Sequence, residues 1–162
     1  MAAYVDWYFA WLYRLVSQRE DTHVFAFGTA VEDLSAAMRQ PYGDAVASLY
    51  ETIEVWGSGT AIGQALKRWD ERYGRMALGS SSHVMVISDG WDVGRPEDLE
   101  TVLKSLAQRS HQLWWLNPLM ITRGFEPRTR ALKIAMHYVS RMTSGATQED
   151  VRRISWMLGL SG

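Results

Sequence analysis

Apolar residues in the first part of the chain recur at the spacing of an α-helix. Between residues 2 and 16 they form two adjacent stripes, Val5, Phe9, Leu12 and Val16 on one and Tyr4, Trp7 and Trp11 on the other. Because each apolar stripe must be buried against another part of the fold, this pattern predicts a helix that is covered on two sides. The segment is shorter than the roughly 20 residues of a membrane span and contains Asp6 and Arg14, so we interpret it as a buried helix rather than a signal peptide.

Strand-like and helix-like segments alternate through the rest of the chain. The predicted strands are residues 23–28, 31–34, 83–88 and 111–116, with a turn at 40–43. The predicted helices are residues 44–54, 61–73, 97–109, 128–138 and 148–158. Strands that alternate with helices of this length predict a mainly parallel sheet with helices on both faces, the three-layer α/β class.

Composition limits what this fold can do. With 162 residues, 47% of them hydrophobic, the chain is long enough for one core, and we expect a single domain over residues 1–162. The 17 Lys and Arg nearly balance the 18 Asp and Glu, which gives no general reason to expect nucleic acid or a membrane as partner. The absence of cysteine excludes disulfides and thiolate metal sites and fits a cytoplasmic location.

Two polar residues occupy positions where such a fold binds ligands. Thr60 lies in a glycine-rich loop before a predicted helix, and Asp89 directly follows the buried strand at 83–88. In open parallel sheets, ligands sit beyond the carboxyl ends of the strands. We therefore expect both side chains at the same rim of the sheet.

Four segments of the chain resemble one known family. They are VFAFGT at residues 24–29, GSGTAIG at 57–63, ISDGWD at 87–92 and WLNP at 115–118. In order and spacing they are similar to signatures of CoxE-like proteins with a von Willebrand factor A (vWA) domain. The resemblance extends from Met1 to about residue 138 and implies a Rossmann-like vWA fold.

The resemblance also implies a metal site. In vWA domains a metal-ion-dependent adhesion site (MIDAS) holds Mg²⁺ through an Asp-x-Ser-x-Ser segment, a threonine and an aspartate, and Thr60 and Asp89 match the last two positions. Hydroxyl and carboxylate oxygens suit a hard cation such as Mg²⁺ or Mn²⁺. The Asp-x-Ser-x-Ser segment is absent here, because in the family it lies immediately before the position that matches Met1.

The strand that carries this segment, the first and central strand of the family's sheet, is missing with it. The strands at 23–28 and 83–88 would then each present unpaired backbone groups. Three arrangements would resolve this: the natural polypeptide begins upstream of Met1, the two strands pair directly, or another chain supplies the strand. We expect the first.

The candidate residues also have structural interpretations. Thr60 or Ser58 could cap the helix that follows, and Asp89 and Asp92 could stabilise the turn around Gly90. The loop at 57–60 could also cradle a phosphate, although it lacks the Lys-Ser/Thr ending of a P-loop.

Other residues point to protein partners rather than to catalysis. Trp56 and Trp91 lie in the two rim loops, where exposed aromatic residues often anchor interfaces, and with Ser58 and Asp92 they form the predicted partner-binding set. The predicted helix near the end of the chain is basic and could contact an acidic partner; RNA is the less favoured alternative. The basic residues include Arg128, Arg130, Lys133 and Arg141. The four histidines show no metal-type spacing, and no catalytic triad can be assigned, so we predict no enzyme activity.

The family resemblance implies a function in partnership. CoxE-like vWA proteins are associated with MoxR-type AAA+ ATPases in the maturation of metalloenzymes such as carbon monoxide dehydrogenase. We therefore expect an adaptor that docks through a partial metal site on the ATPase or on a client metalloenzyme. The alternative is a metal-free structural subunit that binds its partner through a sheet edge or the basic helix. One version of this alternative is a homodimer.

Overall fold

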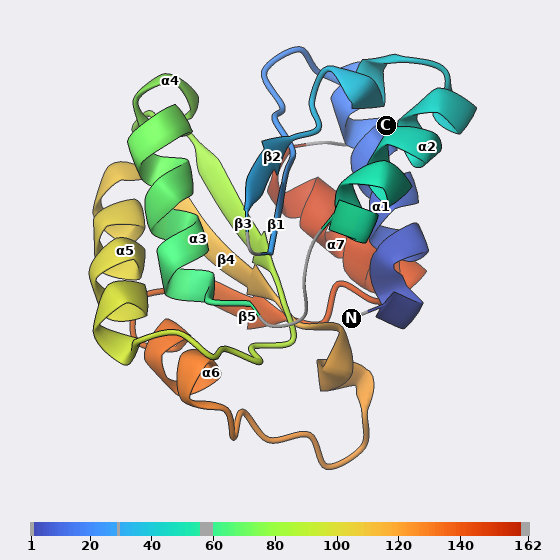
Figure 1. Cartoon of the computed structure of the whole chain (residues 1–162). Coiled ribbons are helices and arrows are strands. Elements are labelled where there is room, and N and C mark those ends of the chain that lie inside the picture. The colour runs from blue at the N-terminus through green and yellow to red at the C-terminus, as the bar shows by residue number, and fades with distance from the viewer. Residues whose placement is uncertain (1, 29, 56–59, 160–162) are drawn as a thin grey trace.

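The computed structural model describes residues 2–28, 30–55 and 60–159 (Figure 1). The helices are α1 Ala2–Gln18, α2 Tyr42–Val55, α3 Ile62–Trp69, α4 Arg75–Ala77, α5 Pro96–Arg109, α6 Arg130–Ala135 and α7 Gln148–Met157. The strands are β1 Phe25–Phe27, β2 Val31–Asp33, β3 His83–Ile87, β4 Gln112–Leu116 and β5 Arg141–Thr143. Short 3-10 turns lie at η1 Ala37–Arg39 and η3 Pro118–Ile121, and a π-helical turn, η2, spans Asp70–Gly74.

Three strands form a parallel sheet in the order β3-β4-β5. In the register of β3 and β4, His83 pairs with Gln112. In the register of β4 and β5, Trp114 pairs with Arg141. Helices cover this sheet on both faces, with α3 and α5 on one side and α1 and α7 on the other (Figure 1). The three-layer α/β arrangement predicted from the sequence is confirmed.

Side chains of the central strand alternate between two cores. Leu113 and Trp115 join the core under α3, α5 and α6, whereas Trp114 and Leu116 join the core under α1 and α7. All four are at most 2% exposed. Because successive residues of a strand point to opposite faces, an unbroken apolar run here requires cover on both sides.

The hairpin of β1 and β2 extends the same layers without joining the sheet. Phe25, Phe27 and Val31 pack into the core under α3, whereas Val24 and Ala26 pack against α1 and α2. β1 pairs with β2 in antiparallel register, and no backbone hydrogen bond joins either strand to β3 in the part of the chain that the structure describes. The direct pairing of β1 with β3, one of the three arrangements considered above, is therefore not what the structure shows.

Helix α1 is covered on two sides, as its two apolar stripes predict. Phe9 and Val16 pack with the hairpin and α2, and Trp11 packs with β4 and α7. The hydroxyl of the buried Tyr8 donates a 2.6 Å hydrogen bond to the carbonyl of Ser144, which fixes α1 to the segment between β5 and α7. Burial raises the pKa of Tyr8 well above its usual range, and the charge of Asp150 adds to this effect.

Several boundaries differ from the predictions. The helix expected at 61–73 gives way to a π turn after Trp69, where the side chain of Asp70 forms an ion pair with Arg109 of α5. A Cβ atom on Gly74 would lie 2.0 Å from Oδ1 of Asp70, so a glycine here leaves room for the Asp70 carboxylate in its ion-paired position. The helix expected at 128–138 is shorter, and that expected at 44–54 begins at Tyr42, inside the predicted turn. Strand β5 was not predicted.

Close packing between α3 and α5 depends on one glycine. A Cβ atom on Gly63 would lie 2.4 Å from the backbone nitrogen of Leu99, a distance that backbone atoms cannot accommodate without moving. Leu99 is fully buried at this crossing. The missing side chain thus brings the start of α3 onto α5, which places the loop before α3 at the rim of the sheet.

We predict opposite effects for the same substitution at two helical glycines. Gly63→Ala should lower the free energy of unfolding by about 1–3 kcal/mol because it forces α3 and α5 apart. Gly43→Ala, in open space in α2, should raise it by up to about 1 kcal/mol through helix propensity. Equilibrium urea unfolding measures both, and a stabilising Gly63→Ala would contradict the assigned packing.

Candidate functional site

Two loops meet at the carboxyl end of β3. One is the segment before α3, which contains Thr60, and the other is the β3–α5 loop, which begins at Ser88. The Val93 N–H donates a 3.1 Å hydrogen bond to the Thr60 carbonyl, and the Ile62 N–H donates a 2.8 Å bond to Oδ1 of Asp92. These bonds join residues 60–62 to the β3–α5 loop, which also contains Asp89.

Asp92 holds this junction together. Its Oδ1 accepts hydrogen bonds from the N–H groups of both Ile62 and Gly94, the second at 2.9 Å. The N-cap position of α3 is Ala61, whose side chain cannot cap, so Asp92 satisfies the helix start from 30 residues further along the chain. The interpretation of Thr60 as the helix cap is therefore wrong, and Asp92 has a structural role besides its predicted partner contact.

Asp89 is half-buried and tied to its own loop. Its Oδ1 accepts a 3.1 Å hydrogen bond from the Trp91 N–H, and its carbonyl accepts a 3.3 Å bond from Nδ2 of Asn117. Asn117 is fully buried, and its Oδ1 accepts from the Leu119 N–H at the start of η3. Asn117 thus links the β3 and β4 ends of the rim. The turn-forming role considered for Asp89 is present in the structure.

Thr60 and Asp89 offer the right chemistry for a hard cation, but only part of a coordination shell. A threonine hydroxyl and a carboxylate are oxygen donors of the kind that Mg²⁺ accepts, with water in the remaining positions. No group of three or more His, Cys, Asp or Glu side chains in residues 2–28, 30–55 and 60–159 is arranged to hold a metal. Trp56 and Ser58, two of the predicted partner-binding residues, lie outside the described residues.

The rim presents exposed apolar side chains. Trp91 is 73% exposed and Val93 64% exposed, and both belong to the β3–α5 loop. Leu119 and Ile121, in the turn after β4, are exposed as well. Large apolar side chains gathered on adjacent loops are typical of an interaction surface.

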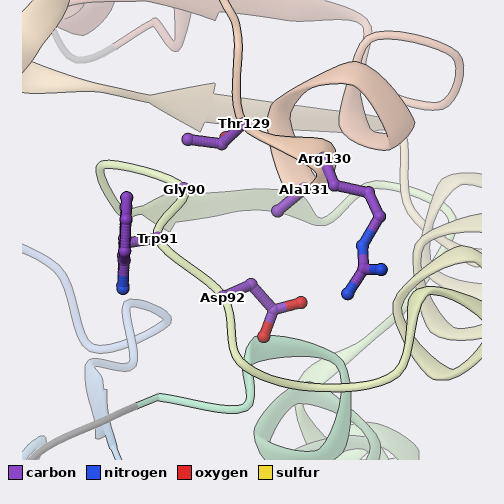
Figure 2. A pocket seen from close by; sticks show the side chains of 6 residues that line it. All are labelled: Gly90, Trp91, Asp92, Thr129, Arg130 and Ala131. Carbon is purple, nitrogen blue, oxygen red and sulfur yellow. The ribbon is translucent and has the colours of Figure 1, made fainter.

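A hollow that the sequence did not predict lies beside this rim, between the β3–α5 loop and α6 (Figure 2). It has a volume of about 290 Å³. Its lining consists of Gly90, Trp91, Asp92, Thr129, Arg130 and Ala131. The basic character of the late helix was visible in the sequence, but the position of Arg130 opposite Trp91 was not.

Two of the histidines, apparently scattered in the sequence, meet at the opposite end of the sheet. The rings of His83 and His111 lie edge to face with their centroids 5.2 Å apart. Burial lowers the pKa of His83, and the neighbouring His111 lowers it further.

Comparison with known proteins identifies one family. The model of the family described as "VWA domain containing CoxE-like protein" matches residues 1–151. A crystal structure titled "Uncharacterized Membrane Spanning Protein from Vibrio fischeri" shares 12% identity over 93% of this chain and 81% of that chain, with a TM-score of 0.33, which is too low to carry an argument. No curated protein matches the chain. None of the helices in the described ranges has the length and apolar character needed to cross a membrane.

We predict that Asp92 stabilises the rim through its acceptor oxygen rather than through its charge. Asp92→Ala removes the hydrogen bonds to Ile62 and Gly94 and should lower the free energy of unfolding by about 1–2 kcal/mol. Asp92→Asn keeps an acceptor oxygen and should retain most of the stability. Chemical denaturation compares the two variants, and equal losses in both would show that the charge itself is required.

Proposed function

Because this chain belongs to the family of CoxE-like proteins with a vWA domain, we propose that it is an adaptor that recognises protein partners for a MoxR-type AAA+ ATPase. The client would be a metalloenzyme under maturation, such as carbon monoxide dehydrogenase. The ATPase would supply the mechanical work, and the vWA domain would supply recognition. In this proposal the chain itself is not an enzyme.

The observation that carries the proposal is the hydrogen-bonded junction of the two rim loops. The bonds from Val93 to Thr60 and from Ile62 to Asp92 hold residues 60–62 against the β3–α5 loop. Trp91 extends from this fixed junction and is largely exposed. A loop that is held by hydrogen bonds and carries an exposed aromatic residue suits binding, because ordering of the loop beforehand lowers the entropy lost on association.

The partial adhesion site is the proposed contact point. Thr60 and Asp89 would hold Mg²⁺ or Mn²⁺, and a carboxylate of the partner would complete the coordination. The half-buried position of Asp89 supports this role, because partial exclusion of water strengthens its attraction to a cation. Trp91, Asp92 and the predicted partner residues Trp56 and Ser58 would surround this contact.

Matched substitutions test the metal contact. Thr60→Val removes the hydroxyl at nearly constant volume, and Asp89→Asn removes the charge while keeping an oxygen that can accept from the Trp91 N–H. Both should abolish binding of Mg²⁺ and Mn²⁺ in isothermal titration calorimetry and retention of the MoxR-type ATPase in a pull-down. Thr60→Ser, which keeps the hydroxyl, is the control and should bind both. Unchanged retention of the ATPase by the first two variants would refute the proposed contact.

A second candidate function is a metal-free subunit that binds through a sheet edge. The observation that favours it is the edge of β3 opposite β4, which forms no backbone ladder with any strand of the described residues. An unpaired edge can accept an additional strand from another chain. This function predicts partner binding that is unchanged by EDTA, and a homodimer if a second copy supplies the strand; light scattering measures the mass.

A further inference from the structure

The hollow between the β3–α5 loop and α6 is built by a close approach of the two segments. Gly90 adopts a positive φ of 79°, and a Cβ atom there would lie 2.5 Å from Cγ of Leu132 and 2.9 Å from Oγ1 of Thr129. Only glycine combines this backbone conformation with such contact. The β3–α5 loop therefore packs closely against the start of α6. Trp91 projects from the loop and Arg130 projects from the helix (Figure 2).

Arg130 brings a positive charge without a direct ion-pair partner to this hollow, whose lining also includes Asp92. Among the described residues Arg130 makes one hydrogen bond, from Nη2 to the carbonyl of Gly94 at 3.2 Å, and no ion pair. Its neighbours Arg95 and Arg128 do pair with carboxylates, those of Glu97 and Glu126. An exposed guanidinium that has one carbonyl partner keeps most of its donors available for a carboxylate.

The surrounding segment is basic although the whole chain carries a net charge of −1. Residues 123–141 contain one acidic residue, Glu126, and five basic ones: Arg123, Arg128, Arg130, Lys133 and Arg141. Charge complementarity thus favours an anionic occupant at the side of the hollow that α6 forms.

The opposite side of the hollow is suited to a peptide rather than to a free anion. Trp91 offers a broad apolar surface on this side, and the methyl group of Ala131 adds to the apolar lining on the α6 side. Asp92 supplies an acceptor, since its Oδ1 is used by backbone N–H groups and its Oδ2 accepts none within the described residues. A bare anion would meet the negative charge of Asp92, whereas the N–H group of a peptide could donate to it.

We propose that this hollow binds an acidic segment of a partner protein, whose carboxylate pairs with Arg130 and whose apolar neighbour packs on the indole of Trp91. Asp92 accepts a hydrogen bond from the backbone of the segment. The proposal rests on the proposed role of the rim as an interaction surface but needs no metal, because none of the groups that it uses is a predicted metal ligand.

Nuclear magnetic resonance with two tripeptide probes tests the proposal in the presence of EDTA. The acetylated amide Leu-Asp-Leu should shift the indole N–H resonance of Trp91, assigned by its loss in Trp91→Phe, at concentrations up to about 10 mM, which detects millimolar affinity. The Leu-Asn-Leu analogue, which lacks the charge, should produce a much smaller shift.

Variants of α6 supply the matched controls. Arg130→Gln should weaken binding of Leu-Asp-Leu at least about tenfold, the loss expected for one charge-assisted hydrogen bond. Lys133→Gln removes the same charge from an exposed position outside the lining and should bind within about twofold of the unaltered chain, because surface charges are screened by salt. The amide spectra report whether each variant is folded.

Three results would overturn the proposal: no shift of the Trp91 indole with Leu-Asp-Leu, an equal shift with Leu-Asn-Leu, or equal weakening by Arg130→Gln and Lys133→Gln. Because EDTA is present throughout, a failure of the metal contact leaves these results unchanged. Conversely, metal binding by Thr60 and Asp89 is measured separately and does not depend on Arg130. The two proposals can therefore fail independently.

Discussion

The arrangement of this protein depends on two adjacent tryptophans in the central strand. Trp114 and Trp115 point to opposite faces of the sheet, and neither is more than 2% exposed. Each side chain has a large apolar surface that must leave water, so each face needs its own layer of helices. Helices α3 and α5 supply one layer, and α1 and α7 supply the other. The polar ends of the indoles are accommodated as well, since Nε1 of Trp115 donates to the Ser88 carbonyl and Nε1 of Trp114 donates to Gln112.

The bond from Trp115 to Ser88 also connects the core to the rim. Ser88 is the last residue before Asp89, so the buried indole fixes the point at which the β3–α5 loop leaves the sheet. From there, Asn117 and Asp92 tie the loop to the end of β4 and to the start of α3. The rim is thus an extension of the core packing. The exposed side chains of the rim are therefore positioned by residues buried beneath them.

The sequence pattern predicted the helices and strands whose own residues show a clear apolar pattern. It failed where contacts with residues far away in the chain determine the structure. The stripes of α1 and the apolar run of β3 are local signals, and the structure confirms both. Strand β5, Arg141–Thr143, has no apolar run and is a strand because it pairs with β4. The cap of α3 comes from Asp92 rather than from the adjacent Thr60, and the opposition of Arg130 and Trp91 arises only when α6 packs against Gly90. The spacing of residues within one segment cannot predict such contacts between segments. The metal-binding roles of Thr60 and Asp89 remain predictions from family resemblance.

In the described part of the chain, the hairpin of β1 and β2 contacts the core through its side chains rather than through backbone hydrogen bonds to the main sheet. Phe25 packs against Trp69 and Tyr73, at ring centroid distances of 5.6 Å and 4.7 Å. Among the described residues, the backbone hydrogen bonds of the hairpin stay within it or reach the adjoining segments. A unit held in this way can open without breaking the hydrogen bonds of the main sheet, which is what a local opening reaction requires. Its amide protons should therefore exchange with solvent long before those of β4. The molecule would combine a slowly exchanging central sheet with a hairpin that samples open states.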